Sequence, residues 1–312
     1  MARNVRVVES HRYYLITNRC ILGMFLMRPD DECRRILKGC LARAVDKYGV
    51  ELVCFVFMSN HFHLIARFPE LNMAEFMEEL QSQIARRINN HRGRKGKFFG
   101  QRYDDQALLD HQVLRDKICY VLNNPLNDRA VRTAADWPGV TSMTCHRDGA
   151  PLEGKWLNAK TWTNLKRREG DYRREDAMET YSVDLHLPEA LEGETDEERR
   201  ENLLELVEND REDTWEKATG DRNRPPRVSG KRAVLSKSWQ YRSDEPGKKY
   251  ERSRLGVAVD TDVMGDYEDE RQQTTRDYRR ASGAWRRSKA EPFPAGTYPP
   301  GWRRCVGFKS TA

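Results

Sequence analysis

The sequence predicts an α+β fold for the first half of the chain: a ferredoxin-like antiparallel sheet with helices on one face. Three observations support this prediction. Short apolar runs alternate with amphipathic stretches, two of the runs are separated only by a short turn, and the last amphipathic stretch ends at a proline. We therefore expect a domain over 1–150 and a poorly defined, charged extension over 151–312, either accessory or partly disordered.

The first strand and the first helix are predicted within residues 11–49. The run HRYYLIT at 11–17 has the composition of a strand. Asp30 or Asp31 can cap a helix whose apolar residues recur at intervals of three and four. Gly49 ends that helix.

A hairpin, two further helices and a last strand complete the predicted domain. Residues 50–58 are nearly all apolar, as in a strand covered on both faces, and 61–68 form its partner after a short turn. Apolar residues at helical spacing predict helices over 73–88 and 111–124. Between them, 103–109 fits an edge strand.

Charge divides the chain at about the same point. Residues 1–150 hold 23 Lys and Arg against 17 Asp and Glu, whereas the remainder holds 32 of each. The whole formal charge of +6 therefore lies in the first half, as expected if that half meets a polyanion. In the second half the patterns weaken, and only a helix over 197–207 and a strand near 255–259 are predicted.

Composition excludes several classes of protein. The longest apolar runs are seven residues long, whereas a transmembrane helix needs roughly 20, so no membrane partner is expected. The N-terminus lacks the apolar centre of a secretory signal, which favours a cytoplasmic protein. The seven cysteines contain no CxxC pair, which favours reduced thiols over a disulfide framework or a zinc ribbon.

The sharpest local feature is the sequence His61-Phe62-His63 at the start of a predicted strand. Because strand side chains alternate, the two imidazoles project from one face, opposite an apolar face, at a separation suited to one divalent metal. The alternative is a pair of surface histidines on an open sheet face, since short motifs often match by chance.

The helix over 111–124 carries a second candidate pair. At about 100° per residue, Tyr120 lies roughly 145° from the centre of the apolar stripe and Asn124 roughly 105°. The two residues are i, i+4 neighbours and lie side by side, away from the packing face. A tyrosine and an amide oxygen in this position indicate a role other than packing, although Pro125 also gives this end of the helix a structural function.

Four segments together resemble the REP-associated branch of the IS200-like, single-tyrosine HUH transposases. Residues 56–65 (VFMSNHFHLI) resemble the signature v-M-p-N-H-x-H-l, and 120–125 (YVLNNP) resemble the tyrosine helix Y-I-x-x-N-P. Residues 135–138 (ADWP), with Thr-Ser shortly after, resemble D-W-P-x-S-S, and 99–103 (FGQRY) resemble l-W-Q-r-r-y. The resemblance covers about residues 10–145. It departs at Ser59 (usually proline), at Phe99 (usually tryptophan) and at 127–130, where NDRA stands for v-r-a-G.

This resemblance implies an HUH endonuclease-like fold and a metal-dependent nickase, a DNA transposase. His61, His63 and Asn124 would hold Mg²⁺ or Mn²⁺, and Tyr120 would attack a phosphodiester to form a 5′-phosphotyrosine link and free a 3′-hydroxyl. The implied partner is single-stranded or hairpin DNA, in a protein associated with the bacterial nucleoid. Related enzymes are monomers or dimers, so a homodimer stays open.

A basic run follows the predicted helix over 73–88 and contains no acid between 86 and 103. Interleaved aromatics could stack on unpaired bases, or could simply anchor a solvated loop. One turn before Tyr120, a lysine could contact phosphate. The predicted DNA-binding residues are Arg86, Arg87, Arg92, Arg94, Lys95, Lys97, Arg102, Tyr103 and Lys117.

Three alternatives stay open. The chain could be a domesticated DNA-binding protein of the same fold whose catalytic activity is weak or lost. The presence of Tyr120, both histidines and Asn124 argues against this alternative. It could be an RNA-binding module, which would need aromatics where the histidines stand. A zinc site from Cys54, Cys119 and the histidines is a third alternative, although both cysteines occupy apolar positions.

Overall fold

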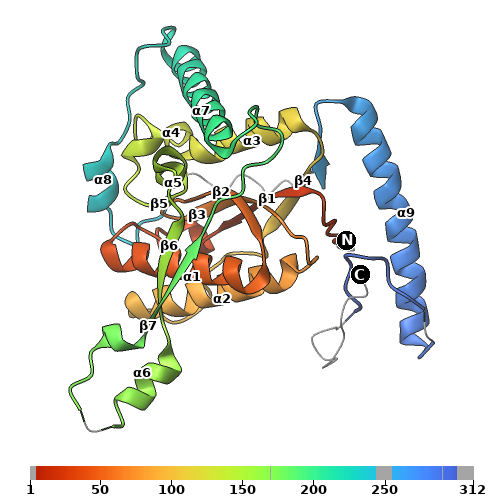
Figure 1. Ribbon diagram of the computed structural model, residues 1–312, viewed down its shortest axis with the longest axis horizontal. Helices are drawn as coiled ribbons and strands as arrows, with labels where there is room; N and C mark the ends of the chain where they lie inside the picture. Colours follow the sequence, from red (N-terminus) through yellow and green to blue (C-terminus); the bar gives the residue numbers. More distant parts are fainter. Residues whose placement is uncertain (1–4, 169, 244–254, 290, 301–312) are drawn as a thin grey trace.

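The computed structural model describes residues 5–168, 170–243, 255–289 and 291–300. Its centre is an antiparallel sheet in which β1 lies between β3 and β4, and β2 lies beyond β3 (Figure 1). The order β2-β3-β1-β4, with a helix after β1 and another after β3, confirms the predicted ferredoxin-like α+β arrangement. The four strands are β1 (Tyr13–Arg19), β2 (Glu51–Phe57), β3 (His61–Arg67) and β4 (Asp104–Leu108).

Two short strands extend this sheet at its edges. β5 (Val140–Thr141) pairs with β2 in antiparallel fashion, and β8 (Gly256–Val257) pairs with β4 in parallel. The predicted strand over 103–109 is therefore not an edge strand, because a segment from the far end of the chain covers it.

One face of the sheet is covered by α1 (Asp31–Tyr48) and α2 (Met73–His91). The carboxylate of Asp30 caps α1 by accepting a hydrogen bond from the Cys33 amide. Gly49 ends the helix at φ 59°, in the left-handed region where glycine is favoured. Both ends therefore lie where the sequence predicts them.

The opposite face is also covered, which corrects the prediction of helices on one face only. α3 (His111–Leu122) packs on β2, β3 and β4, and α7 (Asp196–Thr219) packs on α3 (Figure 1). Their apolar residues form a second core cluster with alternate residues of the strands. The face that carries His61 and His63 is therefore partly enclosed.

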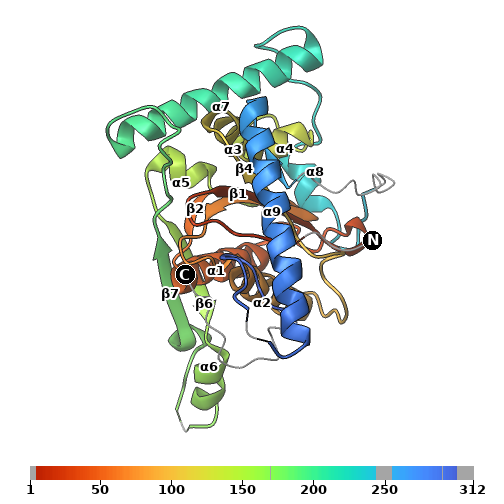
Figure 2. The same cartoon turned by 90° about the vertical axis from the view of Figure 1, so that its right-hand side faces the viewer.

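The second half of the chain packs around the sheet domain. The hairpin of β6 (Leu152–Leu157) and β7 (Met178–Val183) lies against α1, and α9 (Thr261–Arg286) runs along the β8 edge (Figure 2). The predicted helix over 197–207 lies within the longer α7. The remaining elements are η1 (Ile21–Gly23), α4 (Asn124–Asn127), η2 (Ala134–Asp136), α5 (Met143–Asp148), α6 (Ala159–Leu165), η3 (Arg174–Ala177) and α8 (Lys231–Ser236). The division of function at residue 150 stays a prediction.

The described cysteines are free thiols, and all but Cys145 are buried; Cys305 lies outside the described residues. No helix in the described ranges combines the length and the apolar composition that crossing a bilayer requires.

His146 gives the fold a pH-dependent stability. It is buried on α5 beside Val53, whose carbonyl lies 3.0 Å from its Nε2, and burial lowers the pKa of His146 to about 4. The unfolded chain takes up this proton near pH 6.5 and the native state only near pH 4, so stability falls as the pH falls through this window. Between pH 7 and pH 4.5, the free energy of unfolding of the wild type should fall by about 2.5 kcal/mol more than that of His146→Gln. Urea unfolding at the two pH values measures this difference, and equal losses would contradict it.

Candidate active site

The two histidines are the first and third residues of β3. Phe62 points into the core with α1 and α2, so His61 and His63 point to the other face, toward α3. The Asn60 amide lies just before the strand; its Nδ2 donates to the Gly23 carbonyl (3.3 Å) and its Oδ1 lies 2.7 Å from Nδ1 of His61. Asn60 therefore accepts the Nδ1 proton, and this tautomer leaves the lone pair of His61 on Nε2.

The end of α3 supplies the other two candidates. Tyr120 is 38% exposed and lies off the buried stripe, as its helical position predicts. Asn124 is 3% exposed and opens α4, with Pro125 as the next residue of that short helix. Asn123, between the two helices, is fixed by α7, because its Nδ2 donates to the Val207 carbonyl at 2.9 Å.

These side chains meet in one cleft of about 660 Å³. Nε2 of His61 lies 3.2 Å from Oδ1 of Asn124. The rings of His61 and His63 stand edge to face with centroids 5.0 Å apart, and those of His63 and Tyr120 are 5.3 Å apart. The four residues singled out from the sequence are therefore neighbours in space.

The surroundings of the cleft favour the neutral forms of two of these groups. Burial, helped by the neighbouring His61 and Lys117, holds the pKa of His63 well below its usual value. Burial also raises the pKa of Tyr120; the carboxylate of Asp128 raises it further, and the contact with Asn124 opposes these effects. At neutral pH the site therefore presents a neutral imidazole, the form that binds metals, and a protonated phenol.

The residues fit a divalent metal. His63 is 8% exposed, and its Nδ1 is buried without a hydrogen-bond partner in the described structure. Imidazole nitrogens together with an amide oxygen are donors that suit Mn²⁺ and, less closely, Mg²⁺. Within the described ranges, no three histidine, cysteine or carboxylate side chains already surround one point, and Cys54 and Cys119 are not among the residues that line the cleft.

A segment from the second half of the chain forms one wall of this cleft. We call residues 229–243, which include α8, the strap. At one end the Ser229 and Gly230 amides donate to the carbonyls of Arg129 and Ala130, at 2.9 and 2.8 Å. At the other end the Phe25 amide donates to the Tyr241 carbonyl at 2.9 Å, and Arg19 Nη2 donates to Oγ of Ser243 at 2.8 Å. Sequence patterns did not indicate these contacts, because the strap has no periodicity or motif.

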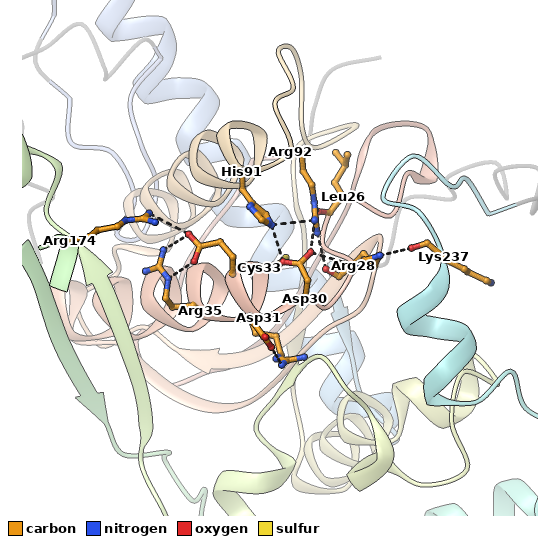
Figure 3. A network of polar contacts seen from close by, with 12 residues as sticks. Leu26, Arg28, Asp30, Asp31, Cys33, Arg35, His91, Arg92, Arg174 and Lys237 are labelled. Atoms are coloured by element: carbon orange, nitrogen blue, oxygen red, sulfur yellow. Dashed lines mark hydrogen bonds and ion pairs between the residues drawn. The ribbon is translucent and has the colours of Figure 1, made fainter.

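Part of the predicted basic run serves the fold. Arg92 forms an ion pair with Asp30 and donates a hydrogen bond to the Arg28 carbonyl at 2.9 Å (Figure 3). Oδ1 of Asp30 also lies 2.9 Å from Nε2 of His91. Arg28 in turn donates to the Lys237 carbonyl of the strap at 3.1 Å (Figure 3). With its side chain 7% exposed, Arg92 is a structural residue, which corrects its assignment to DNA binding.

Other residues of that assignment also make contacts within the fold. Tyr103 is buried under Arg6, whose guanidinium lies 3.8 Å from the ring centroid, so Tyr103 offers no stacking surface to a base. Arg87 lies on the Trp156 ring at 3.5 Å and donates to the Leu157 carbonyl. Arg94 donates to the Lys97 carbonyl and holds the loop. Four residues of the run are exposed, namely Arg86, Lys95, Lys97 and Arg102. Lys117 stands 5.6 Å from the Tyr120 ring centroid.

The exposed cations of this run should supply salt-sensitive affinity for DNA. The triple variant Lys95→Gln, Lys97→Gln and Arg102→Gln should reduce the slope of log affinity against log salt by about 2 on single strands, at about 0.7 per lost contact. Fluorescence anisotropy across a salt series measures the slope. Arg92→Gln is the matched control: it should lower thermal stability and leave the slope unchanged. An unchanged slope in the triple variant would place the DNA path elsewhere.

The fold and the cleft define an α+β protein of ferredoxin-like topology with a histidine- and tyrosine-lined site. Residues 28–113 match the family model described as "Transposase IS200 like", in agreement over this segment with the wider family that the sequence resembles. The matched segment contains His61 and His63 but ends before Tyr120 and Asn124. No curated protein matches the chain.

Several solved structures are similar in part. The REP-associated tyrosine transposase bound to a REP hairpin is 18% identical over 48% of this chain and 86% of its own, with a TM-score of 0.38. A candidate transposase from Deinococcus radiodurans R1 is 22% identical over 40% of this chain and 97% of its own, with a TM-score of 0.28. The tRNA(His) guanylyltransferase of Saccharomyces cerevisiae is 10% identical over 41% of this chain and 64% of its own, with a TM-score of 0.31. At such low TM-scores none of these likenesses bears on function by itself.

Proposed function

We propose that this protein is a transposase that cuts and rejoins single-stranded or hairpin DNA through a covalent link to Tyr120. The observation that carries the proposal is the cleft in which the exposed Tyr120 side chain faces His63, beside His61 and Asn124. A nucleophile next to a set of metal donors is the arrangement that phosphodiester cleavage requires. The family match over residues 28–113 supports the same reaction class.

In the proposed reaction, the Tyr120 oxygen attacks the phosphorus. The new bond joins tyrosine to the 5′-phosphate, the bond from phosphorus to the 3′-oxygen breaks, and the phenolic proton passes to solvent as the 3′-oxygen gains one. A phosphate ester replaces a phosphate ester, so the strand can be rejoined by reversal without a nucleotide cofactor. His61, His63 and Asn124 would hold a divalent metal, Mg²⁺ or Mn²⁺, which when bound polarises the phosphodiester.

The rest of the cleft supports a DNA substrate. Arg19, Arg129 and Lys237 line it and can neutralise the phosphates that flank the reacting one. This function also implies a protein located in the cytoplasm, at the nucleoid.

Labelled hairpin oligonucleotides with single-stranded flanks test the proposal. After incubation with Mg²⁺ or Mn²⁺, a denaturing gel should show a protein–DNA adduct and a shortened strand with a free 3′-hydroxyl. Omission of the metal should abolish both products. DNA that is bound but never cut, under any divalent metal, would instead support the domesticated DNA-binding protein.

A further inference from the structure

Asp128 continues the line of site residues by one more helical turn. Tyr120, Asn124 and Asp128 are spaced by four residues, and the Asp128 amide donates to the Asn124 carbonyl at 3.0 Å. The segment 127–130 (NDRA) is one of the places where this chain departs from the family signature, whose v-r-a-G contains no acid. The carboxylate is therefore a feature of this chain, and the reaction proposed above does not use it.

Three atoms that can donate a lone pair to a metal, one nitrogen and two oxygens, face one another at His61. Its Nδ1 proton is held by Asn60, so its lone pair is on Nε2. Nε2 lies 3.2 Å from Oδ1 of Asn124 and 3.8 Å from Oδ2 of Asp128. Two ligands that each lie roughly 2.1 Å from one ion stand about 3 to 4 Å apart. The two distances from Nε2 of His61, to Asn124 and to Asp128, both fall within this range.

The charged residues that line the cleft also indicate that Asp128 faces a cation. Among the described residues that line it, three are basic and Asp128 is the single acid. A carboxylate beside Tyr120 repels both a developing phenolate and the phosphodiester that the tyrosine would attack. A divalent cation between them turns that repulsion into attraction on both sides, because it binds carboxylate and phosphate oxygens alike.

We propose that Asp128 is a further ligand of the divalent metal in this cleft, so that two imidazoles, one amide oxygen and one carboxylate share the ion. The inference rests on the proposed function, since it presumes the metal centre. Oδ2 of Asp128 already faces His61, and the side chain is 48% exposed. The added negative charge strengthens binding of the hard ions Mg²⁺ and Mn²⁺, which prefer oxygen ligands.

Mn²⁺ binding to the full-length protein without DNA tests this assignment, by calorimetry and by the loss of the free-ion signal in electron paramagnetic resonance. Asp128→Asn should weaken the Mn²⁺ affinity at least about 10-fold, the lower end of what loss of a supporting group costs a metal site. The matched control is Asp116→Asn. Asp116 is exposed on α3, one turn before Tyr120, and does not line the cleft. Its substitution should leave the affinity unchanged.

Asp128→Ala separates a ligand from a residue that only orients His61. If Asp128 acts merely as a hydrogen-bond acceptor for the imidazole, asparagine restores the Mn²⁺ affinity and alanine does not, which overturns the proposal. Equal affinity in wild type and Asp128→Asn overturns it too. No Mn²⁺ binding by wild type would overturn the metal centre itself, and with it this inference. Thermal melting of the metal-free variants checks folding and should be unchanged, because the side chain is half-exposed.

Discussion

Tyr120→Phe should abolish the covalent protein–DNA adduct and leave the fold intact. The substitution removes the hydroxyl and keeps the ring, which packs edge to face on His63. Without the hydroxyl this side chain has no oxygen that can attack the phosphorus, so strand cleavage should fall on the order of 10³-fold or more. Denaturing gels of wild type and variant with the same labelled hairpin measure the loss, and thermal melting checks stability.

Tyr103→Phe is the matched control for this experiment. Tyr103 belongs to the same domain but is buried under Arg6 and does not line the cleft, so its variant should form the adduct. Peptide mapping of the wild-type adduct should find the nucleotide on the peptide that contains Tyr120. An adduct on another tyrosine, or one that persists in Tyr120→Phe, would show that the nucleophile has been misassigned.

His61→Ala and His63→Ala should both abolish cleavage while DNA binding persists, because each removes a metal donor and neither removes a cation of the exposed basic run. Their stabilities should differ. His61 is partly exposed, whereas His63 is buried between His61 and Tyr120, so its truncation also leaves a cavity and should cost about 1–3 kcal/mol.

Gel cleavage assays across a Mg²⁺ series, anisotropy for binding, and urea unfolding separate these effects. His63→Gln, which fills most of the space, is the control for the cavity and should recover stability without recovering cleavage. Equal nicking by wild type and the double variant His61→Ala/His63→Ala would remove the histidines from the metal site.

The local parts of the site were predictable because they depend on short-range geometry. Strand alternation requires His61 and His63 to share a face, and helical spacing requires Tyr120 and Asn124 to be neighbours. Joining the two pairs depended on the resemblance to a family, since no local pattern specifies which helix covers which face. The expectation of helices on one face only was wrong for that reason, since α3 and α7 cover the other face.

The contacts that sequence patterns missed are those made between distant segments. Arg92 resembles any exposed cation of a basic loop until Asp30, more than sixty residues earlier, is placed beside it. Tyr103 resembles a stacking aromatic until Arg6 covers it. α9 was not predicted, because it is strongly polar and its few buried residues do not form a continuous apolar stripe.

The strap relates the finished cleft to the order of synthesis. A ribosome adds about 5–20 residues per second, and domains generally fold as they emerge. The interval between Asn124 and the last strap residue, Ser243, is therefore on the order of ten seconds. During that time a nascent chain already carries His61, His63 and Tyr120, but lacks the wall that Arg19 and Phe25 later bind. The cleft therefore lacks this wall until the ribosome has added the strap, and it is wider in the nascent chain than in the finished fold.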